Sequence, residues 1–143
     1  MFSKTCEYAI RSCIYIASQS LNDKRVSLID VSQKIESPEA FTSKILQKMV
    51  KANIIRSIKG PGGGFLIDKD QLSNIKINTI IETFDGNVLH QCSLGLPNCS
   101  DEFPCPFHHK YKSVKINLLK IFTTTTLGEL LQDYEEGTTF LKI

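Results

Sequence analysis

The segment from residue 92 to residue 109 places the tightest limit on what this chain can fold into. It reads C-S-L-G-L-P-N-C-S-D-E-F-P-C-P-F-H-H, and it holds three of the five cysteines and two of the three histidines. Glycine and proline lie between the cysteines, and both hinder regular secondary structure. Because a loop buries little apolar surface, core packing explains these thiols poorly. Ligation of a soft metal centre explains them better.

The remaining composition is typical of a soluble protein, with 41% hydrophobic and 22% charged residues. A chain of 143 residues allows one domain, with room for an appendage. No stretch approaches the ~20 apolar residues that span a bilayer, and the first residues do not resemble a secretory signal. The odd number of cysteines fits a disulfide framework poorly. We therefore expect a cytoplasmic protein with reduced thiols and no membrane partner.

Charge is distributed unevenly along the chain. Residues 1–78 carry 12 Lys and Arg against 7 Asp and Glu, whereas residues 79–143 carry 5 against 8. No acidic residue occurs between positions 40 and 67, although five basic residues do. A local field of one sign favours a polyanionic partner. For a charge run by itself, a solvated helix face is the simpler interpretation.

Apolar spacing predicts three helices in the first third of the chain. The first covers residues 3–20, and its apolar stripe includes Cys6 and Cys13, which we interpret as small buried hydrophobic residues. A capping-box spacing that starts at Ser27 opens the second helix. Ser37 as N-cap, followed by proline, opens the third, which runs to about Ala52. Two short helices joined by a tight turn after a third helix form a helix-turn-helix.

A short hairpin is predicted directly after these helices. Two apolar β-branched runs, residues 54–58 and 65–67, flank the glycine-rich segment 60–64. A hairpin in this position is the wing of a winged helix. The glycines lack the spacing and the following lysine of a nucleotide-binding loop, so we disfavour that alternative.

The second half of the chain is predicted to be helical on either side of the cysteine loop, residues 88–106. A short helix precedes the loop, and a long helix over about 106–123 follows it. Apolar residues of the long helix step by 4, 3, 4 and 3 and form a heptad seam: Phe107, Tyr111, Val114, Leu118 and Ile121. We expect a partner subunit to cover this seam; the first helix of the same chain is the alternative. A capping box at Thr126 opens a short final helix.

The predicted fold is therefore mainly α with a small β-hairpin wing. We expect a winged helix-turn-helix DNA-binding domain over residues 1–78. Residues 79–143 would supply the cysteine loop, a long dimerisation helix and the short C-terminal helix.

This order of parts resembles the Rrf2 family of bacterial winged-helix transcription regulators, which includes IscR-like and NsrR-like branches. The resemblance covers nearly the whole chain, and four motifs carry it: the three-cysteine loop, EYAIR at 7–11, RSIKGPGGGF at 56–65 and TLGEL at 126–130. It implies a homodimer that binds double-stranded DNA at a palindromic operator. An enzyme is not expected, since the sequence shows no constellation of acid, base and nucleophile.

The resemblance also implies an iron–sulfur cluster held by Cys92, Cys99 and Cys105. The fourth ligand would be His108, as in the IscR-like branch, or alternatively Glu7 of the partner subunit. The gaps between the cysteines are six and five residues here, whereas they are equal in the IscR-like pattern. A 2Fe–2S cluster is favoured, and a 4Fe–4S cluster remains open.

Other sensing chemistries remain open on the same fold. Zinc also binds thiolates, but structural zinc sites usually use short C-x₂₋₄-C pairs that are absent here. The alternative function is a regulator that senses by thiol oxidation, zinc or a small effector, without a cluster.

The helix-turn-helix and the wing predict the DNA contacts. The start of the third helix would read base edges in the major groove, while basic residues and wing glycines would approach phosphates and the minor groove. The expected contacts are Pro38, Ala40, Phe41, Thr42, Ser43, Lys44, Lys48, Arg56, Lys59, Gly62 and Gly63.

Overall fold

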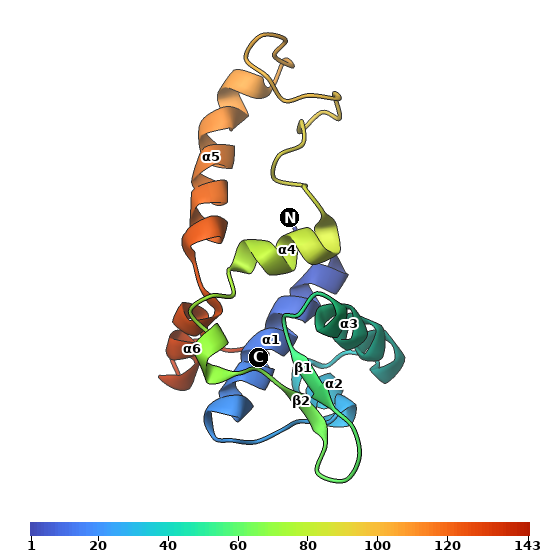
Figure 1. Ribbon diagram of the computed structural model, residues 1–143. Coiled ribbons are helices and arrows are strands. Elements are labelled where there is room, and N and C mark those ends of the chain that lie inside the picture. Colours follow the sequence, from blue (N-terminus) through green and yellow to red (C-terminus); the bar gives the residue numbers. More distant parts are fainter.

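The computed structural model describes all residues from 1 to 143. In chain order the elements are α1 (Lys4–Leu21), α2 (Leu28–Ile35), α3 (Glu39–Lys51), β1 (Arg56–Ile58), β2 (Gly64–Leu66), a 3₁₀ turn η1 (Lys69–Gln71), α4 (Ile77–Asp85), α5 (His108–Thr124) and α6 (Leu127–Glu135). Figure 1 shows a body made of α1–α4, α6 and the hairpin. Helix α5 and the loop before it rise from this body as an arm. The mainly helical fold with a wing is confirmed.

Helix α1 lies at the centre of the body and contacts α2, α3, α4, α6, β2 and η1. Its predicted stripe is confirmed, because Cys6, Ala9, Cys13, Ile16 and Ala17 are all fully buried. Most of these side chains are small, so neighbouring helices can approach the α1 backbone closely. The two cysteines of this stripe are core residues.

The start of α2 agrees with the sequence pattern. The Ser27 hydroxyl accepts from the Asp30 N–H at 3.1 Å, and the Asp30 carboxylate accepts from the Ser27 N–H at 2.8 Å. These two bonds satisfy N–H groups that have no partner within the helix. The capping box with Asp in place of Glu is therefore confirmed.

The start of α3 differs from the sequence pattern by one residue. Pro38 is the N-cap and makes no side-chain capping bond, while Ser37 is buried and its hydroxyl has no hydrogen-bond partner. Glu36 adopts a left-handed conformation with φ 55°, and the next N–H, of Ser37, bonds back to the Ser32 carbonyl. This turn directs Ser37 inward, so the prediction of a Ser37 N-cap is wrong.

The end of α3 is fixed by a left-handed residue after the helix. Asn53 has φ 56° and donates to the Val50 carbonyl, and Ile54 donates to the Met49 carbonyl at 3.0 Å. These bonds form a Schellman motif, in which asparagine tolerates the left-handed region. The chain then turns directly into the wing.

The wing is an antiparallel hairpin in which Ser57 faces Phe65. It is shorter than predicted, because Ile54 and Ile55 are buried in the core before β1 begins. Val26 exchanges two backbone hydrogen bonds with Phe65, at 2.8 and 3.1 Å, and so adds a third, one-residue strand. The sequence pattern did not predict this bridge, which attaches the wing base to the α1–α2 connection.

The glycine-rich wing tip is constrained by close packing at Gly63 and by a hydrogen bond to Gly62. A Cβ at Gly63 would collide with the carbonyl oxygens of Ile58 and Gly60, so only glycine fits there. Arg25, in the α1–α2 connection, donates from Nη1 to the Gly62 carbonyl at 2.9 Å. The tip is therefore supported from outside the hairpin.

The arm leaves the body after the end of α4 and rejoins it beside the start of α4 (Figure 1). Lys76 and Thr126 form an isolated bridge, and the Leu127 N–H donates to the Ile75 carbonyl at 2.8 Å. Leu127 and Leu131 of α6 belong to the same core cluster as α1. The second half of the chain thus contributes to the core of the first, and a domain boundary at residue 78 stays a prediction.

Helix α5 has one covered and one uncovered apolar face. Leu119 and Phe122 pack against the core, and the Phe122 ring lies 5.3 Å from that of Phe2. Of the heptad seam, Phe107, Val114 and Ile121 are 43%, 47% and 53% exposed. None of the helices is both long enough and apolar enough to span a bilayer.

The capping box of α6 gives a direct test of the fold. The Thr126 hydroxyl accepts from the Glu129 N–H at 3.1 Å, so we expect Thr126→Ala to lower the free energy of unfolding by about 1 kcal/mol. Thr123→Ala is the matched control, because Thr123 is exposed within α5 and bonds only to helix carbonyls. Urea unfolding measures both. Equal stability of the two variants would contradict a capping role.

Candidate metal centre and nucleic-acid interface

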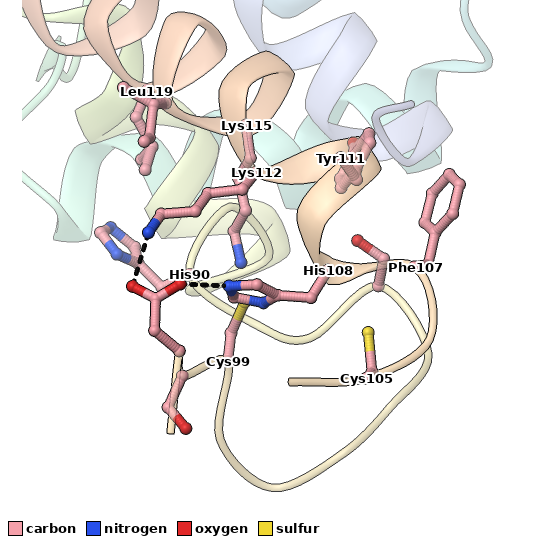
Figure 2. Close-up of a pocket in the computed structure, with 13 residues that line it drawn as sticks. His90, Cys99, Cys105, Phe107, His108, Tyr111, Lys112, Lys115 and Leu119 are labelled. Atoms are coloured by element: carbon pink, nitrogen blue, oxygen red, sulfur yellow. Dashed lines mark hydrogen bonds and ion pairs between the residues drawn. The ribbon is translucent and has the colours of Figure 1, made fainter. Parts of the chain in front are cut away.

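A cavity of about 250 Å³ lies where the cysteine loop meets the start of α5. Cys99, Cys105 and His108 are among its 13 lining residues, as Figure 2 shows. His108 is the first residue of α5, and Cys105 lies just before the helix, where the Cys105 carbonyl accepts from the His108 N–H at 2.9 Å. The end of the loop and the start of the helix therefore form one rigid corner.

Three of the four predicted ligands line the cavity, and two of these three lie side by side: the Cys99 Sγ is 3.6 Å from the His108 Nδ1. Cys92 is buried and is not among the lining residues. Two ligands of one tetrahedral metal atom, with bonds of about 2.3 Å to sulfur and about 2.0 Å to nitrogen, lie about 3.5 Å apart. The Cys99–His108 separation matches this value. The donors present therefore fit a metal centre bound by thiolate and imidazole.

Backbone groups favour the thiolate form of Cys92. Hydrogen bonds from the N–H groups of Leu94 and Leu96 lower the pKa of the Cys92 thiol, and the contact with Cys105 lowers it further. Only the thiolate form is a good metal ligand. Hydrogen bonds to sulfur also tune the potential of iron–sulfur centres. The loop backbone is thus arranged to stabilise negative charge on this sulfur.

The two adjacent histidines differ in how exposed they are to solvent. His108 is 7% exposed and faces the cavity, whereas His109 is exposed. The His108 Nε2 lies 2.9 Å from Oδ1 of Asp101, whose Oδ2 accepts from Lys112 at 2.5 Å. Lys112 and then His108 lower the pKa of the Asp101 carboxyl. Ring nitrogens of both histidines lie within 4.8 Å of each other and of the Asp101 carboxylate.

Glu7, the alternative fourth ligand, lies on α1 in the body. Its carboxylate accepts from Lys4 at 2.6 Å, and it does not line the cavity of its own chain. A role for Glu7 of the partner subunit stays a prediction.

The two cysteines of α1 are not available as ligands. Burial, followed by the charge of Asp85, raises the pKa of Cys6 to about 12, and burial raises the pKa of Cys13. The Cys13 Sγ packs 3.3 Å from the Met49 Sδ. The chain therefore offers three thiols for chemistry, all on the loop.

The start of α3 presents only part of the predicted reading surface. Pro38, Ala40 and Lys44 are exposed, and Ser43 is half-buried. Thr42 is fully buried and its hydroxyl donates to the Pro38 carbonyl at 3.0 Å, so the prediction that it reads bases is wrong.

Phe41 also departs from the prediction. Its ring is half-buried and lies edge-on to that of Tyr8, with 5.8 Å between the centroids. It therefore packs on α1 rather than facing away from the body. Helical spacing accounts for both residues, because Thr42 lies three and four residues before the buried Ile45 and Leu46, and Phe41 lies four residues before Ile45.

The basic residues near the wing differ in how free their charges are. Lys59 is exposed and takes part in no ion pair. Arg56 is paired with Asp68 at 2.7 Å, and the Lys48 ammonium lies 5.0 Å from the Phe84 ring centroid. Lys59 is therefore the wing cation most available to a phosphate.

Sequence reasoning missed the polar residues that support the site. Asp101 contacts His108 across the loop, and Lys115 donates to the Gln91 carbonyl at 2.5 Å. The helical spacing of His108, Lys112 and Lys115 was the available signal, since it places all three on one face of α5. Nothing in the local pattern around Asp101 indicates its partners.

Fold and site together define a winged-helix transcription regulator. Residues 2–133 match the Rrf2 family, described as iron-dependent transcriptional regulators. The chain therefore belongs to the Rrf2 family, and its relatives are transcription regulators rather than enzymes.

Individual relatives agree with this assignment. A protein of Aquifex aeolicus, provisionally named an HTH-type transcriptional regulator, is 30% identical over 95% of this chain and 94% of its own length. The regulator IscR of Vibrio campbellii is 28% identical over 90% of this chain and 75% of its own.

Solved structures show the same fold. CymR, the global cysteine regulator of B. subtilis, has a TM-score of 0.75 at 19% identity and covers 92% of this chain and 96% of its own. T. potens IscR has a TM-score of 0.73 at 19% identity and covers 97% of this chain and 91% of its own. These likenesses confirm the winged-helix fold with its long helix.

The division between loop and core cysteines can be tested by alkylation. In the folded, metal-free, reduced protein we expect iodoacetamide to label the exposed Cys99 at least tenfold faster than the fully buried Cys6 and Cys13, because burial blocks access to those two and raises their thiol pKa. Cys92 and Cys105, which are 8% and 7% exposed, should react at intermediate rates. Mass spectrometry of the peptides at short times measures the rates, with urea-unfolded protein as control. Rapid labelling of Cys6 or Cys13 in the folded protein would contradict this assignment.

Proposed function

We propose that this protein is a homodimeric transcription regulator that binds a palindromic DNA operator. It senses iron–sulfur status, or redox or nitrosative stress, through a cluster bound by its cysteine loop. Cys92, Cys99, Cys105 and His108 would hold the cluster. The 3.6 Å separation between the Cys99 Sγ and the His108 Nδ1 carries this proposal, because it suits two ligands of one metal atom.

The exposed start of α3 and the wing support binding to double-stranded DNA. Ala40, Ser43 and Lys44 would reach base edges in the major groove. Positive charge beside them would neutralise phosphates and give a salt-dependent affinity. The remaining proposed contacts are Pro38, Lys48, Arg56, Lys59, Gly62 and Gly63.

The uncovered heptad seam supports a homodimer. Val114 and Ile121 are about half exposed, although their spacing suits helix–helix packing. A second copy would bury the seam. The dimer would then present two copies of the surface formed by α3 and the wing, one to each half of a palindromic operator.

The proposed centre would supply redox-active iron and sulfide, and the residues around it would hold it and link it to the dimer helix. Cys105 and His108 lie at the first turn of α5, so any change in their positions acts on the helix that carries the seam. A coupling free energy of ~1–3 kcal/mol changes DNA occupancy by about 5- to 150-fold. We propose a 2Fe–2S form, with a 4Fe–4S form as the alternative.

Sensing by thiol oxidation or zinc is the second candidate. The lowered pKa of the Cys92 thiol favours it, because the thiolate is the reactive form. Such a protein would bind no iron and sulfide when purified without oxygen.

The ligands can be tested one at a time. Replacing Cys92, Cys99 or Cys105 with alanine should abolish the visible charge-transfer absorbance of protein purified without oxygen. The iron and sulfide content of the same protein should fall at least tenfold. Cys6→Ala is the control and should keep both. Colour in all three loop variants would contradict a cluster at this site.

The wing contact can be tested through salt dependence. Lys59→Ala should weaken DNA binding and lower the slope of log K against log salt by about 0.9, because one phosphate contact is lost. Lys120→Ala is the control, since Lys120 is exposed and its helix, α5, lies away from the wing in Figure 1. Fluorescence anisotropy with a duplex selected in vitro measures both slopes. An unchanged slope in Lys59→Ala would remove the wing from the interface.

A further inference from the structure

A chain of polar contacts runs from the cavity to the outer surface of α5. The His108 Nε2 lies 2.9 Å from Asp101 Oδ1, and Lys112 donates to Asp101 Oδ2 at 2.5 Å. The His108 side chain is 5% exposed, whereas those of Asp101 and Lys112 are 63% and 43% exposed. An exposed loop carboxylate thus reaches inward to one nitrogen of a buried ring, as the dashed lines in Figure 2 show.

The chemistry of the carboxylate fixes the roles of the two ring nitrogens. An ionised carboxylate only accepts hydrogen bonds, so the His108 Nε2 must carry the proton. In the neutral ring the lone pair then lies on Nδ1. Nδ1 is the atom that faces the Cys99 Sγ at 3.6 Å. The ligand nitrogen is therefore selected by a contact on the opposite side of the ring.

Two simpler explanations account for these contacts less well. A surface ion pair between Asp101 and Lys112 would leave the buried ring unexplained, and exposed pairs contribute little to stability. A separate cation site formed by Asp101, His108 and His109 is disfavoured, because the Lys112 ammonium already lies on the Asp101 carboxylate.

We propose that Asp101 is a positioning residue that holds His108 with Nδ1 directed at the metal, and that Lys112 fixes Asp101 to α5. This inference rests on the proposed cluster function. Metal-ligating histidines commonly donate their second N–H to a carboxylate, which sets the ring orientation and strengthens the ligand. Loss of such a partner typically weakens metal binding by about 10- to 100-fold.

The first test uses the metal-free, reduced protein and so does not depend on a cluster. In water, nuclear magnetic resonance should detect a slowly exchanging imidazole N–H proton, assigned to His108 by its absence in His108→Ala. It should disappear in Asp101→Leu, which removes the acceptor, and persist in Glu102→Leu, which removes the neighbouring exposed acid. A signal that persists in Asp101→Leu, or is missing from the wild type, overturns the positioning role.

The second test uses protein loaded with iron and sulfide without oxygen. Iron should pass to a chelator about tenfold faster from Asp101→Leu than from the wild type or Glu102→Leu. The nitrogen hyperfine coupling of the reduced centre should change in Asp101→Leu alone, which a purely structural role would not cause. Equal release rates and couplings in a loaded wild type and Asp101→Leu overturn the role of Asp101. A wild type that takes up no iron and sulfide overturns the proposed function and this inference together.

Discussion

Burial of the apolar stripe of α1 is the interaction on which the rest of the structure depends. Six other elements pack on this one helix, and its buried residues are mostly small. Apolar burial contributes roughly 25 cal/mol per Å², so the element with the most packed neighbours organises the body. Because α3 turns its apolar residues toward α1, its polar and basic residues face outward. The packing of α3 on α1 therefore determines which α3 residues form the proposed DNA-contact surface.

The arm obeys a different constraint, because the cysteine loop has almost no core of its own. Leu94 and Phe103 are 57% and 74% exposed, and lysines of α5 hold the loop at Gln91 and Asp101. Few buried contacts mean a low local stability. A ligand that binds only the ordered loop would stabilise it by mass action. This is the property that a sensor element needs, and the body does not have it.

Sequence patterns predicted the elements whose causes are local. The Ser27 and Thr126 capping boxes, the end of α3 near Ala52 and the glycine-rich wing depend on neighbours within a few residues, and all are present. Contacts between distant residues were not predictable in this way. The bridge between Val26 and Phe65 is one example.

The errors at the site have different origins. Thr42 was assigned to the reading surface because it lies at the start of α3, although helical spacing from the buried Ile45, Leu46 and Met49 places it on the inner face. Asp101 was missed because its partners lie 7 and 11 residues away on another element. The four metal ligands came from family resemblance, and the geometry now gives a reason to pair Cys99 with His108.

The central claim is that a cluster bound by the cysteine loop changes the DNA affinity of the surface formed by α3 and the wing. The most direct measurement is the affinity of one anaerobic preparation, its iron and sulfide determined, for a DNA duplex selected in vitro, before and after chelation. At constant salt concentration, the account predicts at least a fivefold change in affinity, with the loss of iron and sulfide, and none in a Cys99→Ala variant. Identical binding curves for the loaded and the stripped wild type would contradict it.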